Sequence, residues 1–369
     1  MAGRFSHKKL SDISLDDPFF DSLKEDYPPS SSTDGFVDWF ARKARDGASA
    51  LTFDDDEGIG AFILIKEREK EPLILTANTL PVVERDKIST FRIAPRYQGQ
   101  RLGEGALGLV LWEWQERRTP EIYVTVYPHH IELIRLFERF GFSHVGDTPG
   151  GERVYLRNRI NIDFTDAYTS FPFIHNNFEY GGYLVIEDKY HDSLFAYSEL
   201  AHTVQEKVNL HAKNGLTKVY VGNAFSQNHY IGEPIFIYRK FNRPRGSNEK
   251  PRYKSCLTSF CVVTDIIQAK LDHRILYPET ALLTRIGNKS VFDHNYLSEM
   301  YRTSRNVQIL EMVYYGYFGA GNNVNMDWLD NNGLWTTQNQ YPTGRHLNQN
   351  EFRTILRQGK IDDTNVIVH

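Results

Sequence analysis

The feature that most constrains the fold of this chain is a group of glycines that opens a helix. Gly99, Gly103 and Gly105 follow a strand pattern that ends at Pro95, because proline cannot donate to a strand ladder. The helix is indicated by apolar residues at i, i+3, i+4 and i+7, namely Leu107, Val110, Leu111 and Trp114. The order strand, glycine loop, helix therefore predicts an α/β unit.

A glycine loop at the start of a helix favours the binding of an anion. The first N–H groups of a helix have no intrahelical partner and carry the positive end of the dipole, and glycine allows the backbone to approach phosphate oxygens closely. A pyrophosphate is the ligand we expect, although glycines before a helix also serve simply as turns. A Walker loop is excluded, because no Gly-Lys-Ser/Thr follows the spacer, and a dinucleotide-binding βαβ unit matches poorly, because a hairpin precedes the loop.

The flanking segments predict a mixed, mostly antiparallel sheet covered by helices. Strand patterns lie at 48–53, 59–66, 73–77, 87–93, 121–126 and 153–157. Helices are expected from Phe36 and over 131–140, where Leu133, Leu136 and Phe137 share a face and Gly141 ends the helix.

The domain organisation follows from length and composition. A chain of 369 residues exceeds the size at which one core usually divides. We expect a flexible N-terminal arm at 1–35, where Asp pairs and a PPSSS run occur, an α/β domain at 36–160, and a β-rich α+β domain at 161–369. The last is expected to contain a helix at 198–213, strands at 218–221, 234–239 and 256–267, and a helix at 350–357.

Composition excludes several classes of protein. Apolar residues make up 40% and charged residues 24%, typical of globular proteins, and neither a membrane-length apolar run nor a signal peptide is found. We therefore expect a cytoplasmic protein with no membrane association and no metal. Cys256 and Cys261 are five apart in a strand pattern, on opposite faces, which predicts reduced, structural thiols.

Two segments carry a resemblance to a known family. FRIAPRYQGQRLGEGAL resembles the acyl-CoA motif of GNAT N-acetyltransferases, and HHIELIRLFERFGF resembles their second signature. The likeness covers about Val37 to Arg157 and implies acetyl-CoA as the acyl donor, with no metal. The donor-binding positions that it implies are Ile93, Gln98, Gly99, Gln100, Arg101, Leu102, Gly103, Glu104 and Gly105. Arg101 departs from the pattern, which usually has glycine there.

The resemblance implies direct attack of an amine on the thioester, with the oxyanion donor on the Ile93 main chain. At Phe137 the family often has a tyrosine that protonates the leaving thiolate, and phenylalanine has no proton to give. His130, His129 and Tyr127 stand just before that helix, and we expect one of them to serve. Alternatively, the histidines cap the helix or face water, and the thiolate leaves unaided.

The second half carries a fainter resemblance to PUA-like and ASCH-like barrels, in the runs VYVGNAFSQNHYIGEPIFIYRKF and YKSCLTSFCVVTDII. That likeness implies RNA or DNA as a partner, and the candidate contacts in the basic segment 239–254 are Arg239, Arg243, Arg245, Arg252 and Tyr253. The alternatives are a solvated loop and a packing or dimerisation module. Residues 165–369 hold 21 basic against 20 acidic residues, so phosphate affinity should be modest.

Three functions stay open on the sequence alone. The first is an acetyl-CoA-dependent N-acetyltransferase acting on a nucleic-acid-linked acceptor such as aminoacyl-tRNA or a modified base. The second is an acetyltransferase of a protein or small-molecule amine, and the third a CoA-binding regulator without catalysis. The acceptor, the acyl-chain preference and the oligomeric state are not encoded in any motif that we identify.

Overall fold

The chain divides into two compact units in a computed structural model. One unit comprises residues 1–110 and 117–161, and the other comprises 111–116 and 162–369. The structure describes residues 4–29, 35–201, 203, 205, 211–222, 229–243, 245–335 and 344–369. Each unit is described by itself below.

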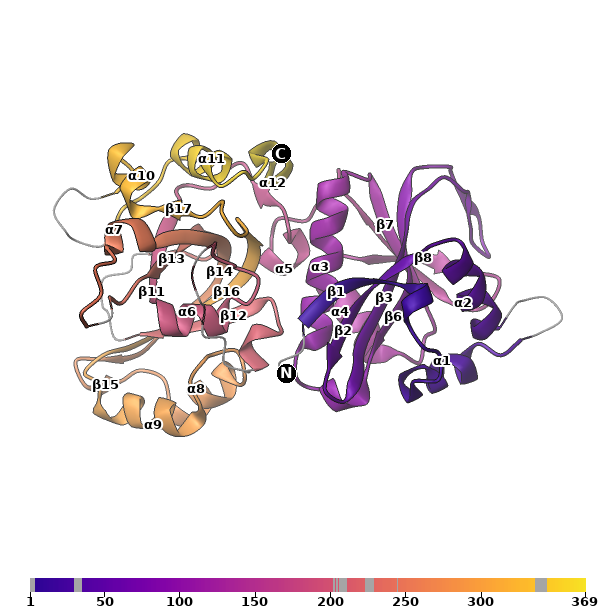
Figure 1. The fold of residues 1–369 in the computed structure, drawn as a ribbon, viewed down its shortest axis with the longest axis horizontal. Helices are drawn as coiled ribbons and strands as arrows, with labels where there is room; N and C mark the ends of the chain where they lie inside the picture. The colour runs from indigo at the N-terminus through magenta and orange to yellow at the C-terminus, as the bar shows by residue number, and fades with distance from the viewer. Residues whose placement is uncertain are drawn as a thin grey trace. The chain divides into compact units, whose positions relative to one another are not determined.

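The N-terminal unit is built on a mixed sheet in the order β1-β2-β3-β6-β7-β9-β8 (Figure 1). Its strands are β1 (Arg4–Lys9), β2 (Ser49–Asp55), β3 (Gly58–Glu69), β6 (Arg85–Ile93), β7 (Glu121–Val126), β8 (Ser143–Asp147) and β9 (Arg153–Asn158). Neighbouring strands run antiparallel except β6 and β7, which are parallel. The mixed, mostly antiparallel α/β sheet that the sequence predicts is therefore present.

Helices cover both faces of this sheet. The helical segments are η1 (Leu10–Asp12), η2 (Pro18–Phe20), α1 (Asp21–Asp26), α2 (Phe36–Arg45), η3 (Pro95–Tyr97), α3 (Leu102–Arg117) and α4 (Ile131–Arg139). Figure 1 shows α3 on the side of the sheet opposite to α1 and α2. Phe40 of α2 and Phe62 of β3 belong to one buried cluster, which fixes α2 on its face.

The expectation of a flexible arm at 1–35 is wrong for the residues that the structure describes. Arg4–Lys9 pairs with β2 as an edge strand, and Leu10 and Phe20 are almost fully buried. The Phe20 ring contacts the rings of Phe36 and Phe62 at centroid distances of 6.0 and 5.3 Å. The acidic and Ser/Pro-rich composition of this segment hid a few large apolar side chains, and these are sufficient to hold it on the sheet.

A second correction concerns residues 73–77, which do not continue the main sheet. β4 (Leu73–Ile74) pairs with β5 (Thr79–Leu80) in a separate two-stranded sheet. Leu73 and Leu75 are buried against Tyr123 and Val154. The apolar run thus reflects packing on the main sheet and not membership of it.

The C-terminal unit contains a curved sheet in the order β11-β13-β14-β16-β12. The strands of this unit are β10 (Ile174–His175), β11 (Gly182–Glu187), β12 (Thr217–Gly222), β13 (Pro234–Lys240), β14 (Cys256–Leu271), β15 (Arg274–Ile275), β16 (Val307–Tyr317), β17 (Val324–Asn325) and β18 (Ile367–Val368). Register shifts along β14 bend this long strand. In the described residues β11 and β12 are the ends of the sheet and do not pair, so these strands form an open sheet and not a closed barrel.

Short helices surround this sheet. They are α5 (Ala167–Ser170), α6 (Asp188–Leu194), η4 (His211–Lys213), α7 (Pro251–Lys254), α8 (Glu279–Ile286), α9 (His294–Thr303), α10 (Met326–Asn331), α11 (Gln349–Gln358) and α12 (Asp363–Val366). The helix expected at 198–213 is wrong for the residues that the structure describes, because residues 198–201, 203 and 205 are not helical and only η4 falls in this range; residues 202, 204 and 206–210 lie outside the described residues. Cys256 and Cys261 are free and buried, and burial raises the pKa of the Cys256 thiol to about 12.

Within the described ranges, none of the helices combines the length and apolar character needed to cross a membrane.

Candidate active site

Strands β6 and β7 diverge part-way along their length. Their parallel ladder runs only from Arg85 and Glu121 to Ile88 and Val124, whereas β6 stays paired with β3 as far as Ile93. The register of β3 and β6 shifts between Leu64 and Ile65, and this leaves Ser89 unmatched at the point of divergence. A bulge of this kind turns a strand away from its neighbour and is frequent beside active sites. The C-terminal ends of β6 and β7, beyond Ile88 and Val124, therefore separate and do not pair with each other.

The glycine loop follows the end of β6 and leads into α3. Gly99 has a φ of +74°, and a Cβ at that position would meet no atom within 4 Å. Gly103, in the first turn of α3, lies between Ile93 and Leu136, because a Cβ added there would sit 3.7 Å from Ile93 Cγ1 and 3.6 Å from Leu136 Cδ2. The start of α3 is thus held close to the last residue of β6 and to α4.

The loop also contains a strained arginine. Arg101 has a φ of +63°, in the left-handed region that L-residues other than glycine seldom adopt. Its guanidinium pairs with the buried carboxylate of Glu104, with Nη2 at 2.8 Å from Oε1 and Nε at 3.2 Å from Oε2. Its Nη1 is buried and has no hydrogen-bond partner among the residues that the structure describes. This side chain therefore holds an unused donor next to the open N-terminus of α3.

The other predicted loop residues fall into two groups. The exposed ones are Gln98 and Gly99, and Gln100 is half-buried, with Nε2 donating to the Arg96 carbonyl at 2.8 Å. Leu102, by contrast, is 1% exposed and belongs to the core. Gly105 is buried as well. The exposed amide of Gln98 can donate to an anion, whereas Leu102 and the glycines can offer only backbone N–H groups.

Tyr127, His129 and His130 lie together where β7 ends and α4 begins. The rings of Tyr127 and His129 are stacked at 5.7 Å, and those of His129 and His130 are 4.1 Å apart. His130 is the N-cap residue of α4, but its side chain makes no capping hydrogen bond. The structure thus brings the three predicted candidates into one cluster.

Within this cluster the pKa of His130 is lowered and that of Tyr127 is raised. Burial lowers the pKa of His130, and the charges of His129 and Arg92 lower it further, against a smaller opposing effect of Asp26. Burial raises the pKa of Tyr127, and the carboxylates of Glu152 and Asp26 raise it further. At neutral pH His130 is therefore a neutral proton acceptor and Tyr127 is a protonated donor.

Comparison with known proteins now identifies this part of the chain. Residues 14–142 match the model of the acetyltransferase (GNAT) family. Residues 14–142 form a GNAT-type domain. The matched segment begins at Ser14, well before the expected start at residue 36, which agrees with the packing of η2 and α1 on the sheet.

A curated relative supports the same assignment. The chain is 33% identical over 72 residues to the spermine/spermidine N(1)-acetyltransferase of Bacillus subtilis, and the matched segment is 19% of this chain and 47% of that protein. The chain thus spans about half the length of the relative that it matches.

Solved structures are similar to part of the chain. Ard1 from Thermoplasma volcanium matches with 14% identity, a TM-score of 0.30, and coverage of 43% of this chain and 98% of that chain. The ribosomal-protein-S18-alanine N-acetyltransferase of Escherichia coli matches with 16% identity, a TM-score of 0.29, and coverage of 42% and 90%. A GNAT acetyltransferase from Elizabethkingia anophelis with acetyl-CoA bound matches with 11% identity, a TM-score of 0.29, and coverage of 42% and 98%.

Phe137 of the GNAT-type domain is a core residue. It is fully buried, and its ring contacts those of Phe91 and Phe142 at 5.7 and 5.1 Å. Phe137 therefore ties α4 to β6 and lies in an apolar environment. A proton donor for this domain has to come from another residue, which directs attention to Tyr127.

Three residues beside the cluster are not marked by any sequence motif. Tyr27, at the end of α1, packs its ring 5.9 Å from that of Tyr127. Asp26 and Glu152 both act electrostatically on Tyr127, and Glu152 accepts a hydrogen bond from Thr125 at 3.2 Å. Asp26 and Tyr27 belong to the segment expected to be a loose arm, and Glu152 lies in the β8–β9 loop. No local motif marks them, because only the fold brings them to the end of β7.

The basic segment of the C-terminal unit is largely neutralised. Arg239 is buried, and its Nε and Nη2 each lie 2.7 Å from a carboxylate oxygen of Asp192. Arg252 pairs with Asp327 and Asp330 at 2.6 and 2.7 Å. The expectation that Arg239 contacts nucleic acid is therefore wrong, because its side chain has no exposed surface to offer.

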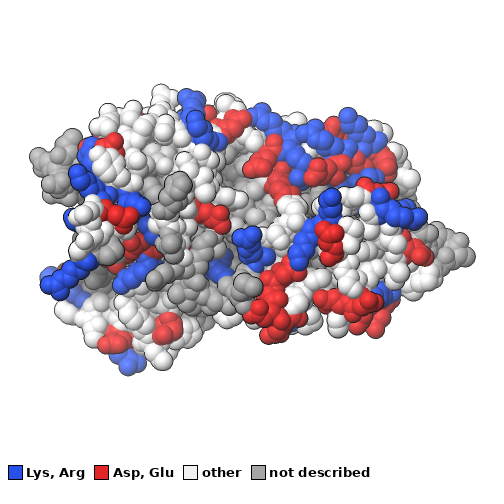
Figure 2. All heavy atoms as spheres, in the orientation of Figure 1, with Lys and Arg blue, Asp and Glu red and all other residues white. Residues whose placement is uncertain are grey.

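The remaining candidates of this segment are exposed but few. Arg243 donates from Nε to the Ser247 carbonyl at 2.6 Å, and Arg245 and Tyr253 are exposed. On the face drawn in Figure 2, basic and acidic side chains alternate over the C-terminal unit, at the left of the view, without one large basic patch. Two exposed arginines provide little of the charge density that phosphate binding requires.

Within the described ranges, no group of three or more His, Cys, Asp and Glu side chains is arranged to hold a metal ion.

Proposed function

We propose that the protein transfers an acetyl group from acetyl-CoA to a primary amine by direct attack of the amine on the thioester. The observation that carries this proposal is the glycine loop that opens α3 against the diverging end of β6 in a domain matching the GNAT family. GNAT acetyltransferases use acetyl-CoA as donor, and direct transfer agrees with the absence of cysteine from residues 1–255.

The donor pyrophosphate is assigned to the loop from Gln98 to Gly105. Backbone N–H groups at the start of α3 supply donors and the positive end of the helix dipole. The buried Nη1 of Arg101 supplies one more donor, so this arginine compensates for the glycine that the family pattern has at its position. The main chain of Ile93, at the diverging end of β6, is assigned to the thioester carbonyl.

Two groups of the cluster are assigned to proton transfer. His130 removes a proton from the acceptor ammonium, and the free amine then attacks the carbonyl carbon of the thioester. The C–S bond breaks as the amide forms, and the CoA thiolate takes a proton from Tyr127. The attacking nitrogen loses its second proton as the amide forms, and this proton returns to Tyr127 through water, so the only proton released overall is the one that His130 has taken up. The lowered pKa of His130 leaves its imidazole neutral at neutral pH, as a base requires. The raised pKa of Tyr127 keeps its hydroxyl protonated there, although it does not make Tyr127 a stronger acid.

The acceptor is proposed to be a cationic small-molecule amine. Asp26 and Glu152 place negative charge around Tyr127, and the neighbouring Tyr27 ring adds an aromatic face. The matched Bacillus subtilis relative carries the name of a spermine/spermidine acetyltransferase, which agrees with an acceptor of this charge. A nucleic-acid-linked acceptor has less support, because Arg239 and Arg252 are held in ion pairs. A PUA-like role of the C-terminal unit likewise has no support beyond the sequence resemblance.

The test combines binding and turnover. Acetyl-CoA is titrated calorimetrically into the full chain, and release of free CoA is then followed with a thiol reagent in the presence of spermidine, lysine or an uncharged amine analogue. We expect binding of acetyl-CoA and a higher kcat/KM for spermidine than for the uncharged analogue. Binding without turnover on any amine would support a CoA-binding regulator, and no binding by the folded chain would overturn the proposal.

A further inference from the structure

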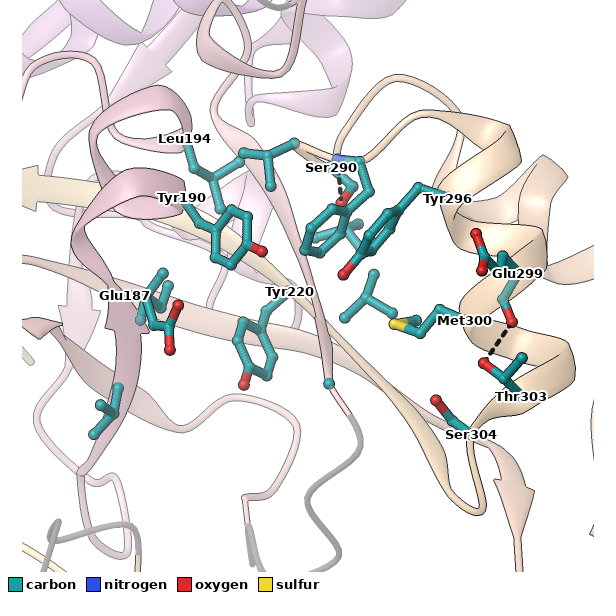
Figure 3. A pocket seen from close by; sticks show the side chains of 17 residues that line it. Glu187, Tyr190, Leu194, Tyr220, Ser290, Tyr296, Glu299, Met300, Thr303 and Ser304 are labelled. Atoms are coloured by element: carbon teal, nitrogen blue, oxygen red, sulfur yellow. Dashed lines mark hydrogen bonds between the residues drawn. The ribbon is translucent and has the colours of Figure 1, made fainter. Parts of the chain in front are cut away.

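The C-terminal unit contains a cavity at the open seam of its sheet. The cavity has a volume of about 520 Å³ and is lined by β11 and β12, the two ends of the sheet, together with α6, α9 and the segment before α9 (Figure 3). Its size lies in the range of small-molecule sites. We call it the tyrosine cavity, after Tyr190, Tyr220 and Tyr296.

Aromatic rings form the inner surface of the tyrosine cavity. Tyr190 projects from α6 and Tyr296 from α9, and Figure 3 shows them directed toward one another across the space. Phe292 stacks on Tyr296 at a centroid distance of 4.5 Å and meets Tyr190 edge-on at 4.9 Å. These contacts fix the rings relative to one another and leave aromatic surface on the cavity side.

Tyr220 completes the aromatic lining because Gly222 has no side chain. A Cβ at Gly222 would lie 2.7 Å from Tyr220 Cε1 and 2.9 Å from its hydroxyl oxygen, so the ring occupies the space that a side chain would fill. Tyr220 therefore lies along its own strand, and its ring forms part of the cavity wall.

Two carboxylates flank these rings. Glu187, at the end of β11, and Glu299, on α9, lie on opposite sides of the tyrosine cavity (Figure 3). Glu187 is 3.8 Å from Lys189 and 3.9 Å from Lys240, distances longer than hydrogen bonds. Among the described residues no Lys, Arg or His lies within ion-pairing distance of Glu299. Glu187 is thus offset by two lysines, whereas Glu299 keeps a carboxylate without an ion-pair partner among the described residues.

The Tyr190 ring already contacts a cation of the protein itself, the ammonium group of Lys189. The ammonium of Lys189 lies 4.5 Å from the centroid of Tyr190 and is well exposed to solvent. This contact is within the range of cation–π attraction, which is stronger where the cation is less hydrated. The inner surface of the tyrosine cavity, with more rings and a second carboxylate, provides the same kind of contact with less water.

We propose that the tyrosine cavity binds an organic cation of the alkylammonium class, held between the faces of Tyr190, Tyr220 and Tyr296 and the carboxylates of Glu187 and Glu299. Electron-rich rings and carboxylates attract a cation together, whereas the two carboxylates repel the phosphates of a nucleotide. The site lies in the C-terminal unit and goes beyond the proposed acetyl transfer.

The test uses two probes of the same shape that differ in charge. Choline and its neutral isostere 3,3-dimethyl-1-butanol are titrated calorimetrically into the full chain, and adenosine is titrated as a planar, uncharged ring. We expect choline to bind at least about tenfold more tightly than the isostere, since the charge supplies the attraction. Equal binding of the two, binding of adenosine alone, or no binding of choline would each overturn the proposal.

Three variants locate the site. Glu299→Gln removes the charge and Gly222→Ala displaces the Tyr220 ring while every charge is kept; each should weaken choline binding about tenfold. Glu279→Gln is the matched control, because this carboxylate pairs with Arg302 at 3.2 Å in the same unit and does not line the cavity. Unchanged choline binding in both Glu299→Gln and Gly222→Ala would place the ligand elsewhere and overturn the proposal. Acetyl-CoA binding, measured on the same samples, should be unaffected, which separates this proposal from the proposed acetyl transfer.

Discussion

Nη2 of Arg101 lies 2.8 Å from Oε1 of Glu104, and the two residues bracket the first turn of α3. The ion pair holds the guanidinium beside the helix N-terminus even though the Arg101 backbone is in the left-handed region. A glycine would relieve that backbone, but it would also remove the buried Nη1 donor. The strained backbone of Arg101 is thus linked to the placement of this Nη1 donor, which we propose contacts the phosphates.

We predict that Arg101→Gly made together with Glu104→Gln weakens acetyl-CoA binding about tenfold or more relative to Glu104→Gln alone. A charge-assisted hydrogen bond contributes about 1.5–3 kcal/mol, and calorimetric titration measures its loss. The glutamine in both proteins avoids a buried, unpaired carboxylate. Equal affinity of the two proteins would show that the guanidinium does not contact the donor.

We predict that His130→Gln lowers kcat/KM about a hundredfold and removes the acidic limb of its pH profile. Because the pKa of His130 is lowered below the ordinary value of about 6.5, the wild-type limb should lie below that pH, and activity should fall as His130 gains a proton. His144→Gln is the control, since His144 is exposed and pairs with Asp147 in the same domain. A limb that persists in His130→Gln would exclude His130 as the base.

We predict opposite effects for two substitutions of Gly103. Gly103→Ala places Cβ at ordinary contact distances from Ile93 and Leu136, so it should keep acetyl-CoA binding and stabilise α3 by about 0.5–1 kcal/mol. Gly103→Leu has to displace one of these neighbours and should abolish binding while the fold, monitored by circular dichroism, persists. Retained affinity in the leucine variant would separate the start of α3 from the donor site.

We predict that Phe137→Tyr destabilises the protein by about 1–3 kcal/mol without raising kcat. The substitution adds a hydroxyl to a fully buried ring between Phe91 and Phe142, and a buried polar group without a partner is costly. Denaturant unfolding and steady-state kinetics measure the two effects. An increase in kcat would mean that a proton donor at this position is what the domain lacks.

We predict that Asp192→Asn costs about 3–5 kcal/mol of unfolding free energy, because it leaves the buried Arg239 guanidinium without its counter-charge. Asp327→Asn is the control: its partner Arg252 is partly exposed and keeps Asp330, so the cost should be below about 1 kcal/mol. Arg239 holds the pKa of Asp192 well below its usual range of about 3.9. The stabilisation by this pair is therefore present above that range and is lost as the pH falls through the lower, folded-state pKa. Similar costs for the two variants at neutral pH would show that burial does not distinguish the two pairs.

Local patterns predicted much of the GNAT-type domain. The period-2 run at 121–126 coincides with β7, and the helix expected at 131–140 is α4 to within one residue, because strands and helices with one buried face carry their period in the sequence. Motif order was sufficient to bring the glycine loop and the His130 cluster into one domain. The edge strand β1 was missed, since a charged strand at the end of a sheet shows little alternation of apolar residues.

Contacts between distant segments could not be predicted in this way. Asp26 and Glu152 reach Tyr127 from opposite ends of the domain, and the tyrosine cavity is formed by segments from Val185 to Ser304. The prediction that Arg239 contacts nucleic acid was wrong for the same reason, because its ion-pair partner Asp192 lies far earlier in the chain. A count of the charges within residues 239–254 cannot show that a distant carboxylate neutralises one of the arginines.

The unpaired ends of the C-terminal sheet have a consequence for evolution. Since β11 and β12 share no ladder in the described residues, the width of the space between them is set by side chains such as Tyr220 and Phe292 and not by backbone hydrogen bonds. Substitutions there can enlarge, narrow or recharge the space at little cost to the sheet. Related chains can therefore acquire different ligands at this seam while they keep the same scaffold.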